Sequence, residues 1–84
     1  MEVFQVYILY SASLDRYYIG QSAQLQDRLF RHNNSGSKST KGANDWQLVY
    51  AQNFETRTQA ILRETYIKKQ KSRKYIENLI KSAG

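Results

Sequence analysis

Cysteine is absent from this sequence of 84 residues, and so is any long hydrophobic run. Without cysteine, neither a disulfide framework nor a thiolate metal site can stabilise the fold, and a bound metal must be held by oxygen or histidine ligands. The apolar stretch at residues 3–10 follows Glu2 and is far shorter than the ~20 residues of a membrane span. We therefore expect a cytoplasmic protein without a membrane partner, and the lack of cysteine agrees with a reducing compartment.

The sequence is also too short for a second hydrophobic core, because 84 residues is the usual size of one domain. We predict a single domain over residues 1–84, with its core between about residues 3 and 80. A chain of this length buries only ~60% of the surface that its unfolded form exposes, so the core is expected to be thin.

The first 34 residues lack a net charge, since three arginines balance three carboxylates there. The formal net charge of +6 therefore lies entirely in residues 35–84, which contain ten Lys or Arg and four Asp or Glu. A basic excess of this kind predicts a polyanionic partner, first of all a nucleic acid, although the lysines of a solvated helix end produce the same pattern. The densest basic run contains Lys68, Lys69, Lys71, Arg73 and Lys74.

Three segments are rich in the aromatic and β-branched residues that favour strands. Polar residues at 11–16 separate the first two segments by so short a distance that an antiparallel hairpin is predicted. The third segment follows a polar loop at residues 33–42. The predicted strands are Val3–Tyr10, Tyr17–Gln21 and Trp46–Gln52.

Three helices are predicted between and after these strands. A serine or threonine precedes each helix and can accept a hydrogen bond from an unpaired amide of the first turn. The resulting order, ββαβαα, predicts an α+β fold in which helices flank a three-stranded antiparallel sheet. The predicted helices are Ala23–Asn33 capped by Ser22, a second from Thr56 or Thr58 to about Lys69, and Arg73–Lys81 capped by Ser72.

A positive charge lies beside the apolar stripe of the first predicted helix. Leu25, Leu29 and His32 form this stripe at helical spacing, and Arg28 lies one turn from both Leu25 and His32. The histidine by itself is weak evidence for a site. Arg28 is therefore expected along or beside the face that packs on the sheet.

A negative charge stands on the expected apolar face of the second helix, because Glu64 is three residues from both Ile61 and Ile67. A charge that faces a core is unfavourable unless it is paired or binds a metal. Glu64 therefore indicates either a metal ligand or an ordinary ion pair with Arg28. Both side chains can also extend to the rim of the core.

Tyrosine is abundant, with seven in the chain, and four of them lie in the predicted first hairpin. Tyrosines in a sheet usually pack with the ring half-buried and the hydroxyl hydrated. Alternation along the second strand places Tyr17 and Tyr18 on opposite faces, so at most one of these two can line a given site. The four hairpin tyrosines are Tyr7, Tyr10, Tyr17 and Tyr18.

The hairpin resembles the namesake motif of the GIY-YIG nuclease superfamily, in which a first strand carries GIY and a second carries YIG. Tyr18-Ile19-Gly20 matches the second segment in full. The first segment is matched by Val6-Tyr7-Ile8, in which Tyr7 holds the functional position and Gln5 replaces the glycine. Some relatives have a lysine after YIG, where this chain has Gln21.

The resemblance continues beyond the hairpin and covers Val3 to about Ile80. Ten residues after Tyr18 the family has an arginine, which Arg28 matches, and four residues further His32 occupies the place of a histidine or tyrosine. Glu64 is similar to the glutamate that the family carries on a later helix. The chain is most similar to the small stand-alone bacterial branch of the superfamily.

This resemblance implies a metal-dependent DNA endonuclease that acts in repair, recombination or restriction-like processing. It implies that Glu64 binds one divalent cation, Mg²⁺ or Mn²⁺, and that Arg28 holds the scissile phosphate. Tyr7 is expected to activate the attacking water, with Tyr18 and His32 orienting the phosphate or water or relaying a proton. A free phenol has a pKa of ~10, so the base would need a cation nearby.

Contacts with DNA are expected from the basic run and from Lys38 and Lys41 in the polar loop. Gly20 is expected to let the backbone approach closely where strand passes into helix. Because a nuclease core by itself binds DNA weakly, a protein partner that adds DNA-binding surface is compatible with the sequence. Double-stranded, branched, damaged and single-stranded DNA all stay open as substrates. The alternative function is a catalytically idle nucleic-acid-binding module of the same fold.

Overall fold

The computed structural model describes residues 3–34 and 40–83, so Lys38 lies outside the described part of the chain. Within these described residues, three strands and three helices follow one another in the order ββαβαα, which confirms the predicted α+β fold. Among the described residues, no helix is long and apolar enough to cross a membrane. The elements are β1 (Phe4–Ser11), β2 (Arg16–Ser22), α1 (Leu25–Asn34), β3 (Trp46–Phe54), α2 (Arg57–Lys69) and α3 (Arg73–Ala83).

The sheet has the order β2-β1-β3, with antiparallel pairing on both sides of β1. Tyr7 of β1 pairs with Gly20 of β2 on one side and with Ala51 of β3 on the other. The pairing of β1 with β3 shifts register after Ile8. As the central strand, β1 is continuously buried from Val6 to Leu9, whereas the edge strands show only partial burial.

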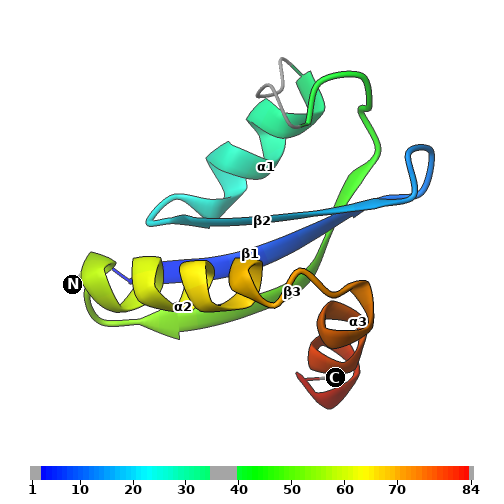
Figure 1. The fold of residues 1–84 in the computed structure, drawn as a ribbon. Helices are drawn as coiled ribbons and strands as arrows, with labels where there is room; N and C mark the ends of the chain where they lie inside the picture. Colours follow the sequence, from blue (N-terminus) through cyan, green and yellow to red (C-terminus); the bar gives the residue numbers. More distant parts are fainter. Residues whose placement is uncertain (1–2, 35–39, 84) are drawn as a thin grey trace.

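Helices cover both faces of the sheet (Figure 1). Tyr7 of β1 belongs to a hydrophobic cluster with Leu25 of α1, whereas the adjacent Val6 packs with Ala60 and Ile67 of α2. Because successive side chains of a strand point to opposite faces, α1 and α2 lie on opposite sides of the sheet. The core is therefore divided into two thin layers, as expected for so short a chain.

Side-chain caps begin the two C-terminal helices where the sequence predicted them. Thr56 accepts a hydrogen bond from the amide of Gln59, and Ser72 accepts one from the amide of Tyr75. The first helix begins two residues later than predicted, because Ser22 is the last residue of β2. These hydroxyls satisfy amides that have no partner within the first turn of a helix.

Arg73 connects the start of α3 to the turn between β1 and β2. Its guanidinium donates to Asp15 Oδ1 at 2.6 Å, to Asp15 O at 3.1 Å and to Glu77 Oε2 at 3.2 Å. The guanidinium carbon also lies 5.3 Å from the centre of the Tyr17 ring. Arg73 is thus engaged in docking α3, although the sequence pattern predicted that it contacts DNA.

Candidate functional site

Tyr7, Tyr18 and His32 come together on the face of the sheet that α1 covers. Tyr7 lies in the middle of β1, Tyr18 lies on the neighbouring β2, and His32 is in the last turn of α1. The Tyr7 hydroxyl is 3.3 Å from His32 Nε2, and the Tyr18 and His32 rings have centroids 4.6 Å apart. Three elements thus bring together three of the five residues that the sequence predicted to be catalytic.

Gly20 leaves the space that the Tyr7 ring occupies. A Cβ atom at this position would lie 2.6 Å from the Tyr7 hydroxyl oxygen and 2.8 Å from its ring carbon Cζ. Both distances are far below a van der Waals contact. The glycine of the motif is therefore needed because the tyrosine ring passes directly over its backbone.

Replacing Gly20 with alanine is expected to displace the Tyr7 ring and to destabilise the protein by about 1–3 kcal/mol, as overpacking does in other cores. Chemical denaturation measures the loss of stability, and the Tyr7 ring resonances report the displacement. Gly42→Ala is the control for the Tyr7 resonances alone, because a Cβ there meets no atom within 4 Å, whereas the backbone φ of 102° by itself disfavours alanine and lowers stability. Unchanged Tyr7 resonances in Gly20→Ala would contradict this account.

Thr40 binds the second ring nitrogen of His32 and was not predicted from the sequence. Its hydroxyl oxygen lies 2.9 Å from His32 Nδ1, and the side chain of Thr40 is fully buried. The indole Nε1 of Trp46 donates to the carbonyl oxygen of Thr40 at 3.1 Å, which anchors the backbone. The sequence contained no signal for this contact, because Thr40 stands in a polar loop without periodicity.

Arg28 is exposed on α1, one turn before His32. Its guanidinium makes no ion pair or hydrogen bond with any other residue of the described part of the chain, although its backbone amide donates to the carbonyl oxygen of Gln24 at 3.1 Å. Its positive charge nevertheless acts on both Tyr7 and His32, where it opposes the rise that burial causes in the pKa of Tyr7 and adds to the lowering that burial causes in the pKa of His32. The predicted alternative, an ion pair between Arg28 and Glu64, is not formed.

Glu64 projects from the face of α2 that carries the buried residues Ala60 and Ile67. The predicted role of Ile61 on this face is wrong, since Ile61 is 42% exposed and points away from the core. Lys68, one turn further along α2, donates to Glu64 Oε2 at 2.8 Å. The carboxylate is only 18% exposed, whereas the lysine side chain is 53% exposed and is free to move into solvent.

The protonation states of the cluster follow from burial and from neighbouring charges. Burial, with contributions from Tyr18 and Glu64, raises the pKa of Tyr7 to about 12, although Arg28 acts in the opposite direction. Burial and then Arg28 lower the pKa of His32. Near neutral pH, Tyr7 is therefore a protonated phenol, and the His32 ring is neutral with one nitrogen free of a proton.

The described residues contain no group of three or more His, Asp or Glu side chains that could by itself hold a metal ion. Among the carboxylates of the described residues, Glu64 is the one whose charge acts on Tyr7. Such a donor set does not fit an ion enclosed by the protein alone. It fits Mg²⁺ or Mn²⁺, because these hard ions are commonly held by one or two carboxylates together with water and substrate phosphate oxygens. Lys68 would then have to leave the carboxylate.

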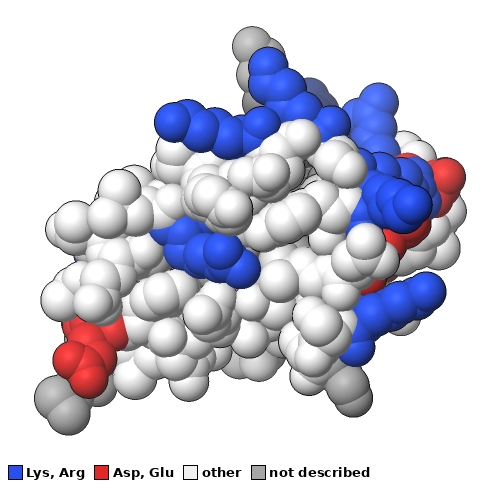
Figure 2. Space-filling model, turned by 60° about the horizontal axis from the view of Figure 1, so that its bottom comes forward, with Lys and Arg blue, Asp and Glu red and all other residues white. Residues whose placement is uncertain are grey.

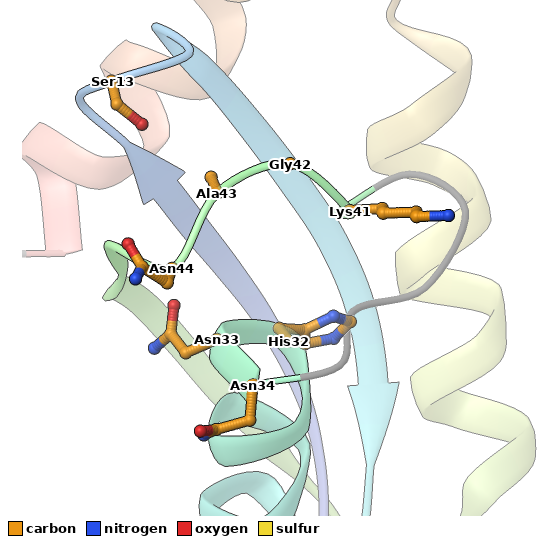
Figure 3. A pocket seen from close by; sticks show the side chains of 8 residues that line it. All are labelled: Ser13, His32, Asn33, Asn34, Lys41, Gly42, Ala43 and Asn44. Atoms are coloured by element: carbon orange, nitrogen blue, oxygen red, sulfur yellow. The ribbon is translucent and has the colours of Figure 1, made fainter.

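An open hollow of about 470 Å³ adjoins the cluster at the C-terminal end of α1. His32 and Lys41 are among the residues that line it (Figure 3). Asn33, also in the lining, is held in place because its side chain both donates to and accepts from the backbone of Trp46. The hollow thus extends the surface next to His32 toward Lys41, which the sequence predicted to contact DNA.

The predicted basic run is divided by the ion pairs of its members. Lys68 is bound to Glu64, and Arg73 is bound to Asp15 and Glu77. The other three members, all exposed, form no ion pair with another residue of the described ranges 3–34 and 40–83. These are Lys69, Lys71 and Lys74.

Comparison with known proteins agrees with the resemblance that the sequence suggested. The sequence model of a protein family, described as the GIY-YIG catalytic domain, matches residues 3–76 of this chain. A UPF0213 protein of Staphylococcus saprophyticus is 40% identical over 52 residues, which are 61% of this chain and 63% of the relative. A UPF0213 protein of Clostridium perfringens is 42% identical over 65 residues, which are 76% of this chain and 69% of the relative. The chain spans just under two thirds of the length of the first of these relatives. No solved structure matches the chain.

Proposed function

The chain belongs to the family of GIY-YIG catalytic domains, a nuclease family, and on that premise we propose that it is a DNA endonuclease that depends on a divalent metal ion. The observation that carries the proposal is the contact of Tyr7, Tyr18 and His32, brought together from β1, β2 and α1. The charges of Arg28 and Glu64 both act on Tyr7. This set combines proton-transfer groups with one cationic and one anionic side chain.

Arg28 is proposed to bind the scissile phosphate. Its guanidinium offers a planar fork of donors that matches two phosphate oxygens, and it has no competing partner among the described residues. When water attacks in line with the leaving oxygen, negative charge accumulates on the oxygens of the pentacovalent phosphorus. A positioned arginine stabilises that charge more strongly than it stabilises the starting phosphodiester.

Tyr7 and His32 are proposed to receive the proton of the attacking water. The Tyr7 hydroxyl is protonated near neutral pH and lies 3.3 Å from a ring nitrogen that can accept its proton. Tyr18, whose ring lies 4.6 Å from the His32 ring, is proposed to orient the phosphate or the water. The phenol does not need to ionise in advance if it passes its proton to the imidazole as it accepts one from water.

Glu64 is proposed to hold the metal ion, Mg²⁺ or Mn²⁺, together with the substrate. When bound, such an ion lowers the pKa of water and offsets the charge of the phosphate. The ion pair with Lys68 shows that the carboxylate already attracts a cation at this position. Because the lysine is exposed and lies at the i, i+4 spacing of a weak surface pair, its displacement costs little.

DNA is proposed to bind across a basic surface that contains Lys69, Lys71 and Lys74. On the face that Figure 2 displays, Lys and Arg side chains outnumber Asp and Glu side chains. Lys69, Lys71 and Lys74 are exposed and unpaired within the described part of the chain, so their charges are available for phosphates. Binding of this kind depends on the DNA backbone and weakens as salt increases.

Neutralising Lys71 and Lys74 with glutamine is expected to weaken DNA binding by the same factor for unrelated sequences. The slope of log affinity against log salt should become shallower by about one unit for each phosphate that the protein no longer neutralises. Binding isotherms at several salt concentrations measure both effects. Lys81→Gln, at the C-terminal end of α3, controls for a general loss of charge. Equal slopes for the double variant and the wild type would mean that DNA binds elsewhere.

Incubation of the protein with supercoiled plasmid and Mg²⁺ or Mn²⁺ tests the proposed function directly. Conversion to nicked and linear DNA, abolished by a chelator, is the expected result. Binding without any cleavage would instead support the catalytically idle module. A cytoplasmic role in DNA repair, recombination or restriction-like processing, with a partner that adds DNA-binding surface, is part of the same proposal. Branched and damaged substrates belong in the assay beside plain duplex for that reason.

A further inference from the structure

A continuous series of buried hydrogen bonds leads from the candidate site into the loop before β3. Tyr7 Oη lies 3.3 Å from His32 Nε2, and His32 Nδ1 lies 2.9 Å from Thr40 Oγ1. Tyr7, His32 and Thr40 are 2%, 6% and 0% exposed, so solvent has little access to these bonds. Trp46 fixes the far end by donating to the carbonyl oxygen of Thr40 at 3.1 Å. Each ring nitrogen of His32 thus has a defined partner.

The direction of these bonds follows from the protonation of Tyr7. A phenol with a pKa of about 12 retains its proton near neutral pH, and a buried hydroxyl proton needs an acceptor. Within hydrogen-bonding distance of this hydroxyl, His32 Nε2 can accept the proton only if it carries none itself. Because a neutral imidazole has one proton, that proton must then be on Nδ1, which faces Thr40 Oγ1.

We propose that Thr40 is a positioning residue, which holds His32 in the tautomer with the proton on Nδ1 and so leaves Nε2 ready to accept the Tyr7 proton during DNA cleavage. This inference rests on the proposed function of the same site. The Thr40 hydroxyl oxygen accepts the hydrogen bond from Nδ1, and the anchored backbone of Thr40 keeps the ring in its orientation. The Nδ1 tautomer is the less favoured form of a free histidine side chain, so its presence requires a partner of this kind.

During cleavage the proton moves from water to Tyr7 and from Tyr7 to His32, while Thr40 holds the His32 ring. Water forms its new bond to phosphorus and gives one proton to Tyr7 Oη, while the proton already on Tyr7 moves to His32 Nε2. The bond from phosphorus to the leaving oxygen breaks, and the leaving oxygen takes a proton from solvent. His32 is then an imidazolium that donates from Nε2 to Tyr7 and from Nδ1 to Thr40, so neither nitrogen lacks a partner. It later returns its additional proton to solvent.

The first test determines the tautomer in the wild-type protein without DNA or metal. The chain contains one histidine, so long-range ¹⁵N–¹H correlation spectra of the uniformly labelled protein report on His32 without ambiguity. We expect a protonated nitrogen at Nδ1 and an unprotonated nitrogen at Nε2 near neutral pH. The reverse assignment, or an equal mixture of the two tautomers, would overturn the proposal. This outcome is independent of whether the protein cleaves DNA, so failure here and failure of the proposed function are distinguishable.

The second test removes the hydroxyl of Thr40 at nearly constant volume. In Thr40→Val we expect loss of the uniform Nδ1 tautomer and a fall in kcat of at least ~10-fold with little change in KM, as loss of an orienting hydrogen bond typically produces. Thr40→Ser, which keeps a hydroxyl, should restore both. The indole Nε1 resonance of Trp46 verifies that the loop is folded, and Thr65→Val on the exposed surface of α2 is the matched control. An unchanged tautomer in folded Thr40→Val would refute the role of Thr40.

Discussion

Glu64→Gln is expected to abolish metal-dependent DNA cleavage, with a fall in rate of about 10³-fold or more. The amide has nearly the same size as the carboxylate but no charge, and hard divalent cations require anionic oxygen ligands. Of the carboxylates in the described part of the chain, Glu64 is the one whose charge acts on Tyr7. The measurement is the initial rate of plasmid nicking at saturating Mg²⁺ or Mn²⁺, compared with the wild type.

We expect the Glu64→Gln protein to remain folded, so that its loss of cleavage reports on the metal site. The substitution breaks the pair of Glu64 with the exposed Lys68, and an i, i+4 pair on a helix contributes only about 0.3–0.5 kcal/mol. The melting temperature should therefore change little. Glu55→Gln, an exposed residue just before α2, removes the same charge away from Tyr7 and should cleave like the wild type. Equal cleavage by Glu64→Gln and the wild type would exclude Glu64 as the metal ligand and would leave the proposed mechanism without a cation site.

Arg28→Ala is expected to lower kcat by about 10²–10³-fold while the affinity for DNA changes much less. The reason is that the guanidinium is proposed to bind the phosphate oxygens most strongly when they carry the additional charge of the transition state. Single-turnover cleavage separates the chemical step from binding, which is measured independently without metal. The kcat of Arg28→Lys should lie between those of the wild type and of Arg28→Ala, because lysine keeps the charge but loses the planar fork of donors.

A matched control for Arg28 is available at the start of β2. Arg16 is exposed, and no other described residue forms an ion pair with it. Arg16→Ala therefore removes one positive charge without removing a group near Tyr7, and its kcat should stay close to that of the wild type. If Arg28→Ala and Arg16→Ala weakened binding alike and left kcat unchanged, Arg28 would be an ordinary backbone contact.

The secondary structure could be predicted from the sequence because the residues involved lie close together in the chain. The two strands of the hairpin alternate correctly, and a hydroxyl residue precedes each C-terminal helix. The ion pair of Glu64 with Lys68 was not predicted, since the sequence pattern suggested Arg28 as the partner, although the spacing of four residues places both side chains on the same side of a helix. The apolar neighbours of Glu64 are a poorer guide, because Ile61 lies on the exposed side of α2.

Contacts between distant segments could not be read in this way. Arg73 was predicted to face DNA as part of a basic run, but it binds Asp15, which is 58 residues away in the sequence. Thr40 stands in a polar loop and shows no periodic signal, yet it is fully buried against His32. Both contacts depend on where α1 and α3 are placed against the sheet, and local spacing contains no information about that placement.

The sequence by itself determined the order of the elements and the family, and it predicted the site residues Tyr7, Tyr18, Arg28, His32 and Glu64, because helical and strand periods and motif spacing are local properties. The tertiary structure decided which of those residues touch. By making β1 the central strand, with α1 on one face and α2 on the other, it brought Tyr7 to His32 and His32 to Thr40. It also decided which charges are already paired, since a side chain binds whatever group the packing of distant elements brings within reach.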